Sequence, residues 1–96
     1  MSVIKIHRPS AEERQRLDIP ETPRANGPWS VWECEPKSFD WNYAEWEIAY
    51  IYEGKVLIKT EGGEVEITAG DMVTFPKGLS CRWEVLQKIR KVYKIE

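Results

Sequence analysis

The sequence predicts an all-β domain of the sandwich or barrel type, and three observations support this prediction. Alternating or β-branched runs recur through most of the chain, and turn signals separate them about every 8–12 residues. Only one short segment, near the N-terminus, has the pattern of a helix. No internal repeat, low-complexity stretch or linker divides the 96 residues. We therefore expect a single domain over residues 1–96.

The N-terminal part, residues 1–28, is expected to contain a short strand, a short helix and a loop. Val3–Ile6 is apolar and β-branched, which favours a strand, and Pro9 ends it. Ser10 then begins a capping box, Ser-Ala-Glu-Glu, so we expect a helix over Ala11–Leu17. Residues 18–28 hold three prolines and one glycine, which indicates a loop.

From residue 29 onward the pattern is that of successive strands. Gly and Pro separate them, because Gly tolerates positive φ and Pro fixes φ. Turns are predicted at Pro36–Ser38, Glu53–Gly54, Glu61–Gly63, Ala69–Asp71 and Pro76–Gly78. The predicted strands are Ser30–Glu35, two runs within Phe39–Tyr52, Lys55–Thr60, Glu64–Thr68, Met72–Phe75, Cys81–Leu86 and Ile89–Ile95. Within the last strand, Lys88–Lys94 is interpreted as half-exposed, with charges that discourage pairing at a sheet edge.

Composition argues against several classes of partner. Lys and Arg number 14 and Asp and Glu number 16, for a net charge of −2, whereas phosphate binding needs a basic surface. We therefore expect no nucleic-acid partner. The sequence has no long apolar run and no signal peptide, so we expect a cytoplasmic protein without a membrane partner. Two cysteines, Cys34 and Cys81, are too few for a disulfide framework and are expected to be reduced.

Two motifs in the second half of the chain resemble those of the cupins. Glu47, six residues and Gly54 resemble the end of the first cupin motif. Gly70, five residues and Pro76-Lys77-Gly78 resemble the second motif. The sequence around both motifs is similar to that of small single-cupin proteins related to the cupin domain of ureidoglycine aminohydrolase. This resemblance covers residues 29–96 and implies an RmlC-like jelly-roll β-barrel with one short N-terminal helix.

The histidine ligands of a metal-binding cupin are absent from these motifs. Such a cupin typically offers three His and one Glu to a transition metal. The resemblance places the Glu on Glu47 and the second-motif His on Cys81. The first-motif His positions fall on Asp40 and Asn42, or on Trp41 and Tyr43, depending on spacing. The sequence therefore assigns no metal or other cofactor, although a divalent transition metal is considered, and the aminohydrolase activity is not carried over.

Aromatic residues are expected around Glu47 if that side chain points into the barrel, as it does in cupins. Strand alternation places Trp41, Tyr43 and Glu47 on one face. Cys81 and Trp83 share a face of a later strand. The predicted ligand-binding residues are therefore Trp41, Tyr43, Glu47, Cys81 and Trp83. A few polar groups among aromatic rings are typical of small-molecule sites.

Two functions are compatible with these residues. The first is a small-molecule-binding cupin without a firmly bound metal, and the loss of the His ligands motivates it. The second is a cupin enzyme that uses Glu47 as acid or base and Cys81 as nucleophile, helper or metal ligand, with or without a metal. Each residue also has a structural alternative, such as a buried carboxyl for Glu47 and a small buried hydrophobe for Cys81. The resemblance further implies a homodimer, since cupins often dimerise by strand exchange or sheet packing.

Overall fold

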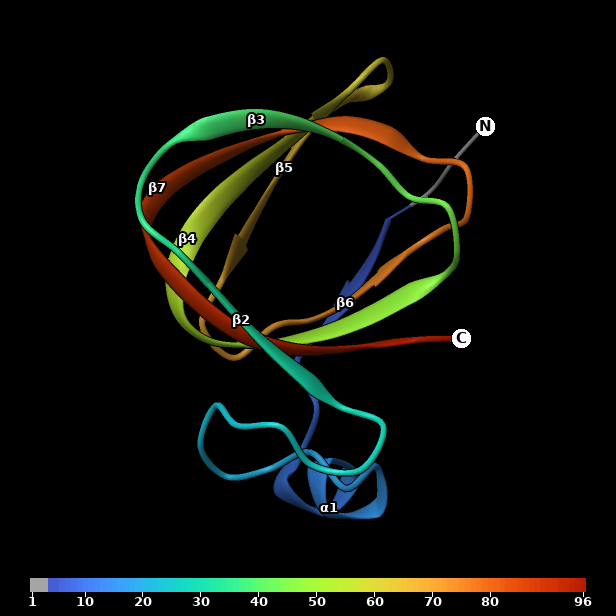
Figure 1. The fold of residues 1–96 in the computed structure, drawn as a ribbon, viewed down its shortest axis with the longest axis vertical. Helices are drawn as coiled ribbons and strands as arrows, with labels where there is room; N and C mark the ends of the chain where they lie inside the picture. The colour runs from blue at the N-terminus through green and yellow to red at the C-terminus, as the bar shows by residue number, and fades with distance from the viewer. Residues whose placement is uncertain (1–3) are drawn as a thin grey trace.

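The computed structural model describes residues 4–96 and shows a single curled β-sheet. Its elements are β1 (Lys5–His7), α1 (Ala11–Arg16), β2 (Ser30–Cys34), β3 (Ser38–Asn42), β4 (Glu47–Thr60), β5 (Gly63–Thr68), β6 (Met72–Phe75) and β7 (Ser80–Ile95). The strands follow the order β1-β6-β4-β7-β2, with β3 paired to β7 and β5 paired to β4, and every pairing is antiparallel. Figure 1 shows the sheet wrapped around a central space, with α1 outside it. This arrangement confirms the predicted β-barrel with one short N-terminal helix.

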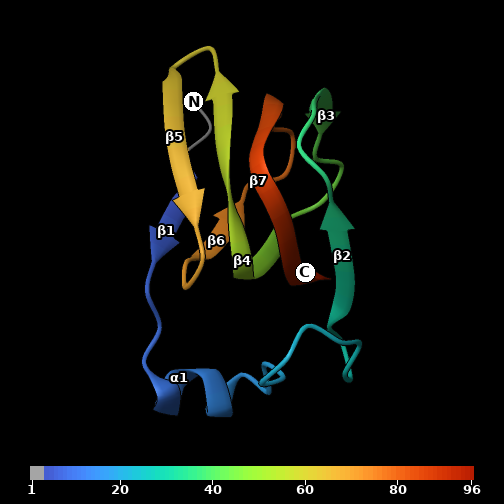
Figure 2. The ribbon, with the colours of Figure 1, turned by 90° about the vertical axis from the view of Figure 1, so that its left-hand side faces the viewer.

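The two longest strands, β4 and β7, pair with each other along most of their length. Figure 2 shows them side by side through the height of the barrel. The C-terminal half of β7 also pairs with β2 on its other side. The prediction that Lys88–Lys94 lies at a sheet edge is therefore wrong. The two predicted strands Cys81–Leu86 and Ile89–Ile95 are likewise one continuous strand.

A bulge in β4 stands where the sequence predicted a turn at Glu53–Gly54. The register between β4 and β7 shifts between residues 51 and 56. Before the shift the buried side chains are residues 47, 49 and 51, and after it they are residues 56 and 58. In β4 the odd-numbered side chains therefore point into the barrel before the bulge, and the even-numbered side chains do so after it. Gly54 makes this possible, because its φ is +103° and a Cβ there would lie 2.3 Å from the carbonyl oxygen of Lys88.

Apolar side chains gather both inside and outside the barrel. The inner cluster includes Ile51, Val56, Ile58, Phe75 and Ile89, all at most 1% exposed. The outer cluster consists of Ile19, Trp29, Met72 and Val92, with partly buried Leu17, Ile48, Tyr50 and Tyr52 packed against it. The outer cluster attaches the N-terminal segment to β4, β6 and β7, so these strands are covered on both faces.

The N-terminal segment follows its prediction closely. The Oγ of Ser10 accepts a hydrogen bond from the backbone N–H of Glu13 at 3.1 Å, so the capping box forms in part and α1 ends one residue before the predicted Leu17. The indole N–H of Trp29 donates to the carbonyl oxygen of Leu17 at 3.0 Å and ties the loop to the helix end. The strand predicted over Val3–Ile6 corresponds to β1, which spans Lys5–His7. Val3 lies outside the described residues. No helix in residues 4–96 has the length and apolar character needed to span a bilayer.

Candidate ligand-binding site

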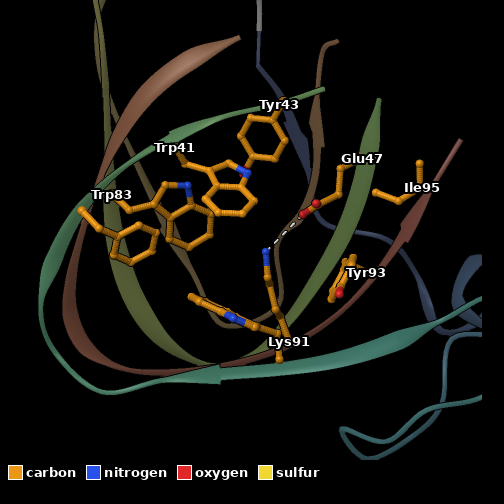
Figure 3. A pocket seen from close by; sticks show the side chains of 9 residues that line it. Trp41, Tyr43, Glu47, Trp83, Lys91, Tyr93 and Ile95 are labelled. Atoms are coloured by element: carbon orange, nitrogen blue, oxygen red, sulfur yellow. Dashed lines mark hydrogen bonds and ion pairs between the residues drawn. The ribbon is translucent and has the colours of Figure 1, made fainter. Parts of the chain in front are cut away.

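A cavity of about 350 Å³ lies inside the barrel, and aromatic side chains form most of its wall. Figure 3 shows these side chains reaching into one space from several strands. The lining residues are Trp32, Phe39, Trp41, Tyr43, Glu47, Trp83, Lys91, Tyr93 and Ile95. The volume falls within the range of about 300–1,000 Å³ that small-molecule sites occupy.

Four of the five predicted ligand-binding residues line this cavity. Trp41 and Trp83 come from the paired strands β3 and β7, and Glu47 comes from the start of β4. Tyr43 follows β3, where its backbone bonds to Leu79 and Gly78 at 2.8 and 2.7 Å. The predicted alternation from Trp41 to Glu47 is thus interrupted, because β3 ends at Asn42 and β4 begins at Glu47.

The fifth predicted residue, Cys81, is buried but does not line the cavity. It is buried, it faces Trp41 across the β3–β7 ladder, and its Sγ donates to the Trp41 carbonyl oxygen at 3.7 Å. Its side chain is not among those that line the cavity. The thiol nevertheless lies close enough to Tyr43 and Lys91 to interact electrostatically with both.

The Tyr43 ring forms a fixed part of the wall. It stacks on Phe75 with ring centroids 4.6 Å apart and an angle of 7° between the planes. Burial raises the pKa of the Tyr43 hydroxyl, and the neighbouring charge of Glu47 acts in the same direction. The hydroxyl therefore stays protonated at neutral pH and can donate a hydrogen bond.

The most informative residue of the cavity is Lys91, which the sequence reasoning placed on a half-exposed strand. That interpretation is wrong, because Lys91 is only 5% exposed. Its Nζ lies 3.2 Å from a carboxylate oxygen of Glu47, which is itself 8% exposed (Figure 3). The structure therefore contains a buried Glu47–Lys91 ion pair, whereas the sequence predicted only the carboxyl of Glu47 at this place.

Aromatic rings surround the Lys91 ammonium. Its Nζ lies 4.7 Å from the ring centroid of Trp83, 5.0 Å from that of Trp32 and 5.4 Å from that of Tyr93. The ring faces attract the cation and offset part of its lost hydration. Burial nevertheless lowers the pKa of Lys91, and the adjacent Glu47 carboxylate opposes that change.

A signal for Lys91 is present in the sequence, although it is weak. Ile89, Lys91 and Tyr93 alternate along β7, and the aliphatic Ile89 belongs to the inner cluster. Lys91 must then face the same interior. The outer face of this stretch is also covered, by Val92 in the outer cluster, so the apolar pattern alone does not say which face is inside.

A second unusual group is the indole N–H of Trp83. Trp83 is 2% exposed, and its buried Nε1 makes no hydrogen bond of good geometry among residues 4–96, although the Tyr43 hydroxyl and the Cys81 thiol lie near it. A buried donor without a partner costs about 1–3 kcal/mol. Because Trp83 lines the cavity, an acceptor on a bound molecule could take this N–H in better geometry than its protein neighbours do.

The donors of the cavity do not fit a transition metal. Among residues 4–96 no three His, Cys, Asp or Glu side chains lie close enough together to hold one. The carboxylate of Glu47 already faces an ammonium 3.2 Å away, which repels a second cation. His7 lies at the end of β1 outside the barrel, with its Nε2 3.0 Å from Glu13.

The buried thiol of Cys81 is expected to react slowly near neutral pH. Burial raises its pKa from the usual 9.0 to about 11, so the thiolate fraction near pH 7 falls about a hundredfold. A Cys34→Ser variant leaves Cys81 as the remaining thiol, and its alkylation by iodoacetamide can be followed by mass spectrometry. We expect a rate at least about a hundredfold below that of the same variant unfolded in urea. Equal rates in the two states would contradict this placement of Cys81.

Comparison with known proteins shows the family to which this chain belongs. A family model described as the EutQ-like cupin domain matches residues 21–93. The chain belongs to this family. A DUF861 family protein from Thermotoga maritima is 43% identical over 98% of this chain and 100% of its own, with a TM-score of 0.87. The search of curated proteins found no match.

More distant cupins share the fold. The EutQ protein of Clostridium difficile is 28% identical over 68% of this chain, with a TM-score of 0.63, and the EutQ-like cupin described here spans 52% of it. A cupin domain from Bordetella pertussis is 15% identical over 99% of this chain and 93% of its own, with a TM-score of 0.54. At that identity the likeness concerns the fold alone. Together the matches confirm the predicted small cupin domain.

Proposed function

We propose that this EutQ-like cupin binds a small organic molecule in the barrel cavity, beside the Glu47–Lys91 pair and without a metal. The observation that carries the proposal is the cavity itself, with its aromatic wall and one buried ion pair. Sites for small molecules combine a largely apolar wall with a few placed polar groups in this way.

The wall favours a flat, largely apolar ligand. Phe39 and Trp83 stack nearly parallel, with an angle of 13° between their planes, and Trp32 meets both rings edge-on. Trp41 is 51% exposed and reaches the cavity from the solvent side. Planar rings offer good contact to such walls at low entropy cost.

The polar groups favour a ligand that carries a hydrogen-bond acceptor. The Lys91 ammonium has three N–H donors, and within residues 4–96 its only hydrogen bond goes to Glu47. The buried indole N–H of Trp83 is a further donor that makes no hydrogen bond of good geometry in that part of the chain. A ligand oxygen in the cavity would satisfy donors that the protein leaves open.

An enzyme that uses Glu47 together with Cys81 is the competing function. Glu47 supports it, since its carboxylate lines the cavity and contacts a group that exchanges protons. Cys81 weighs against it, because its side chain does not line the cavity and burial raises its pKa to about 11. We therefore favour binding at the Glu47–Lys91 pair, and any chemistry would start from these two residues.

The setting that we propose for this function is the cytoplasm. Cys34 and Cys81 are both free and buried, which suits a reducing compartment. A homodimer and the absence of a nucleic-acid partner stay predictions from the sequence. The relation to the ureidoglycine aminohydrolase cupin domain also stays a prediction, and we attribute none of that enzyme's activity to this chain.

Two exposed tryptophans provide a matched test of the binding proposal. Trp41 is 51% exposed and lines the cavity, whereas Trp46 is 45% exposed and does not line it. We expect Trp41→Ala to weaken binding of aromatic fragments about tenfold, because about 1–2 kcal/mol of ring contact is lost. Trp46→Ala should leave the affinity unchanged. A thermal-shift screen of monocyclic and bicyclic aromatic alcohols, phenols and aldehydes, followed by titration of the hits, measures both.

Either of two results would contradict the proposal. In the first, no fragment stabilises the wild-type protein at millimolar concentration. In the second, the hits bind with equal affinity to the Trp41→Ala and Trp46→Ala variants, which would place their site outside the cavity.

A further inference from the structure

We propose that Lys91 takes up its ligand covalently, as a Schiff base with the carbonyl carbon of an aldehyde or ketone. This inference rests on the proposed function, because it names the class of ligand for the same cavity. The features that carry it are a buried primary amine in a cavity, a carboxylate in contact with that amine, and an aromatic wall around both.

The position of Lys91 suits a nucleophile. Its Cα lies in the middle of the sheet, where β7 pairs with β4 at Ile51 and with β2 at Trp32. Its side chain extends from this fixed backbone into the cavity, as Figure 3 shows. Because the ammonium has left bulk water, its cost as a cation is high, and this is how proteins make a lysine amine nucleophilic.

The contact with Glu47 supplies the acid–base partner. A proton can pass directly from Nζ to the carboxylate oxygen over the 3.2 Å hydrogen bond. The transfer turns a buried pair of charges into a neutral amine and a neutral acid, which an apolar cavity tolerates better than separate charges. The other lysines named in ion pairs, such as Lys88 and Lys94, lie nearer to solvent and outside this cavity.

The reaction balances with these two residues and water as the released product. The Lys91 ammonium gives one proton to Glu47, and the free amine forms a bond from Nζ to the carbonyl carbon while the carbonyl electron pair moves to oxygen. Glu47 returns the proton to that oxygen and accepts the next one from nitrogen, which leaves a neutral carbinolamine. Glu47 then protonates the hydroxyl group, water leaves, and the nitrogen lone pair completes the C=N bond. The product is a protonated imine beside the Glu47 carboxylate, with no oxidant or reductant consumed.

The cavity also selects among carbonyl compounds. Aromatic rings on several sides favour a carbonyl attached to a flat apolar group over a sugar or a charged oxo acid. The protonated imine keeps the positive charge that Glu47 and the ring faces already accommodate in the ammonium. We therefore expect aromatic aldehydes to react in preference to small hydrophilic ones.

Reductive trapping tests the inference. The wild-type protein is incubated near neutral pH with benzaldehyde and cyanoborohydride, and the modified peptide is mapped by mass spectrometry. We expect one benzyl group on Lys91, formed at least tenfold faster than on Lys94 of the same strand. A Glu47→Gln variant should slow the labelling of Lys91 at least tenfold while the labelling of Lys94 is unchanged.

A carbonyl-free probe separates this inference from the binding proposal. Benzyl alcohol has the same ring as benzaldehyde but cannot form an imine, and its binding can be followed by tryptophan fluorescence. Should it bind and slow the labelling of Lys91, both proposals are supported. Should it bind while benzaldehyde labels Lys91 no faster than Lys94, the Schiff base is overturned and the binding function stands. Should neither compound bind in the cavity, the binding function itself is contradicted.

A double variant guards against loss of the fold. Lys91→Met alone leaves the Glu47 carboxylate buried without a partner, so its failure to react could reflect unfolding. The Glu47→Met/Lys91→Met variant keeps the volume and removes both charges. It should stay folded by circular dichroism and give no fast-labelled lysine. If rapid labelling persisted in this folded variant, the reactive amine would be another lysine and the inference would be wrong.

Discussion

Replacement of Lys91 by methionine is expected to destabilise the protein by about 3–5 kcal/mol. The change leaves the Glu47 carboxylate buried among aromatic rings without the ammonium that lies 3.2 Å from it. Glu47→Met should cost a similar amount for the mirror-image reason. Urea unfolding followed by circular dichroism measures both free energies of unfolding.

The double variant distinguishes a buried ion pair from two independent side chains. Removing both charges together leaves no unpaired charge, so Glu47→Met/Lys91→Met should lie within about 1 kcal/mol of the wild type or be more stable. Lys88→Met, on the exposed part of the same strand, serves as the control and should cost less than about 1 kcal/mol. Additive losses in the double variant would contradict the coupling between Glu47 and Lys91.

Gly54→Ala is expected to destabilise the protein by about 3 kcal/mol or more. Two effects combine at this position. A φ of +103° is strained for any residue with a side chain, and the added Cβ would lie 2.3 Å from the carbonyl oxygen of Lys88 and 2.7 Å from the Cα of Ile89. Both neighbours are backbone atoms of β7, so the clash is relieved only if the β4–β7 pairing shifts.

Gly78 provides the matched control for this substitution. Its φ is +88°, but a Cβ there would meet no atom within 4 Å. Gly78→Ala therefore carries the backbone strain without the clash, and it should cost about 1–2 kcal/mol. Equal losses at Gly54 and Gly78 would show that β4 and β7 are not packed closely at the bulge. A larger loss of stability at Gly54 would show that the close packing of β4 against β7 at the bulge stabilises the fold.

Local signals predicted most of the elements of this barrel. The strand predicted over Met72–Phe75 is β6 to the residue, and the turn predicted at Glu61–Gly63 lies between the end of β4 and the start of β5. These predictions succeed because Gly, Pro and β-branched residues act on their own backbone. Gly54 was misread because a glycine at positive φ has the same local signal in a turn and in a bulge. Only the pairing with β7 separates the two.

The candidate site was predictable only in part for a similar reason. The cupin resemblance led to Glu47, and alternation led to its aromatic neighbours. Lys91 lies 44 positions from Glu47 in the sequence, and the two meet because β4 and β7 pair. No pattern of neighbouring residues predicts this contact, and a lysine between an arginine and a valine is normally interpreted as a surface residue. The pairing of β4 with the C-terminal strand β7 therefore brings Lys91 to Glu47, and neither cupin motif contains this lysine.

The most direct test of this account is a crystal structure of the protein soaked with benzyl alcohol. We expect the ring of the probe between the aromatic walls of the barrel, with its hydroxyl group in hydrogen-bond contact with Lys91 or the indole N–H of Trp83, and the Glu47–Lys91 pair intact beside it. A cavity closed by side chains, or a metal ion bound to Glu47 in place of the Lys91 ammonium, would contradict the central claim that this cupin binds an organic ligand at a buried ion pair.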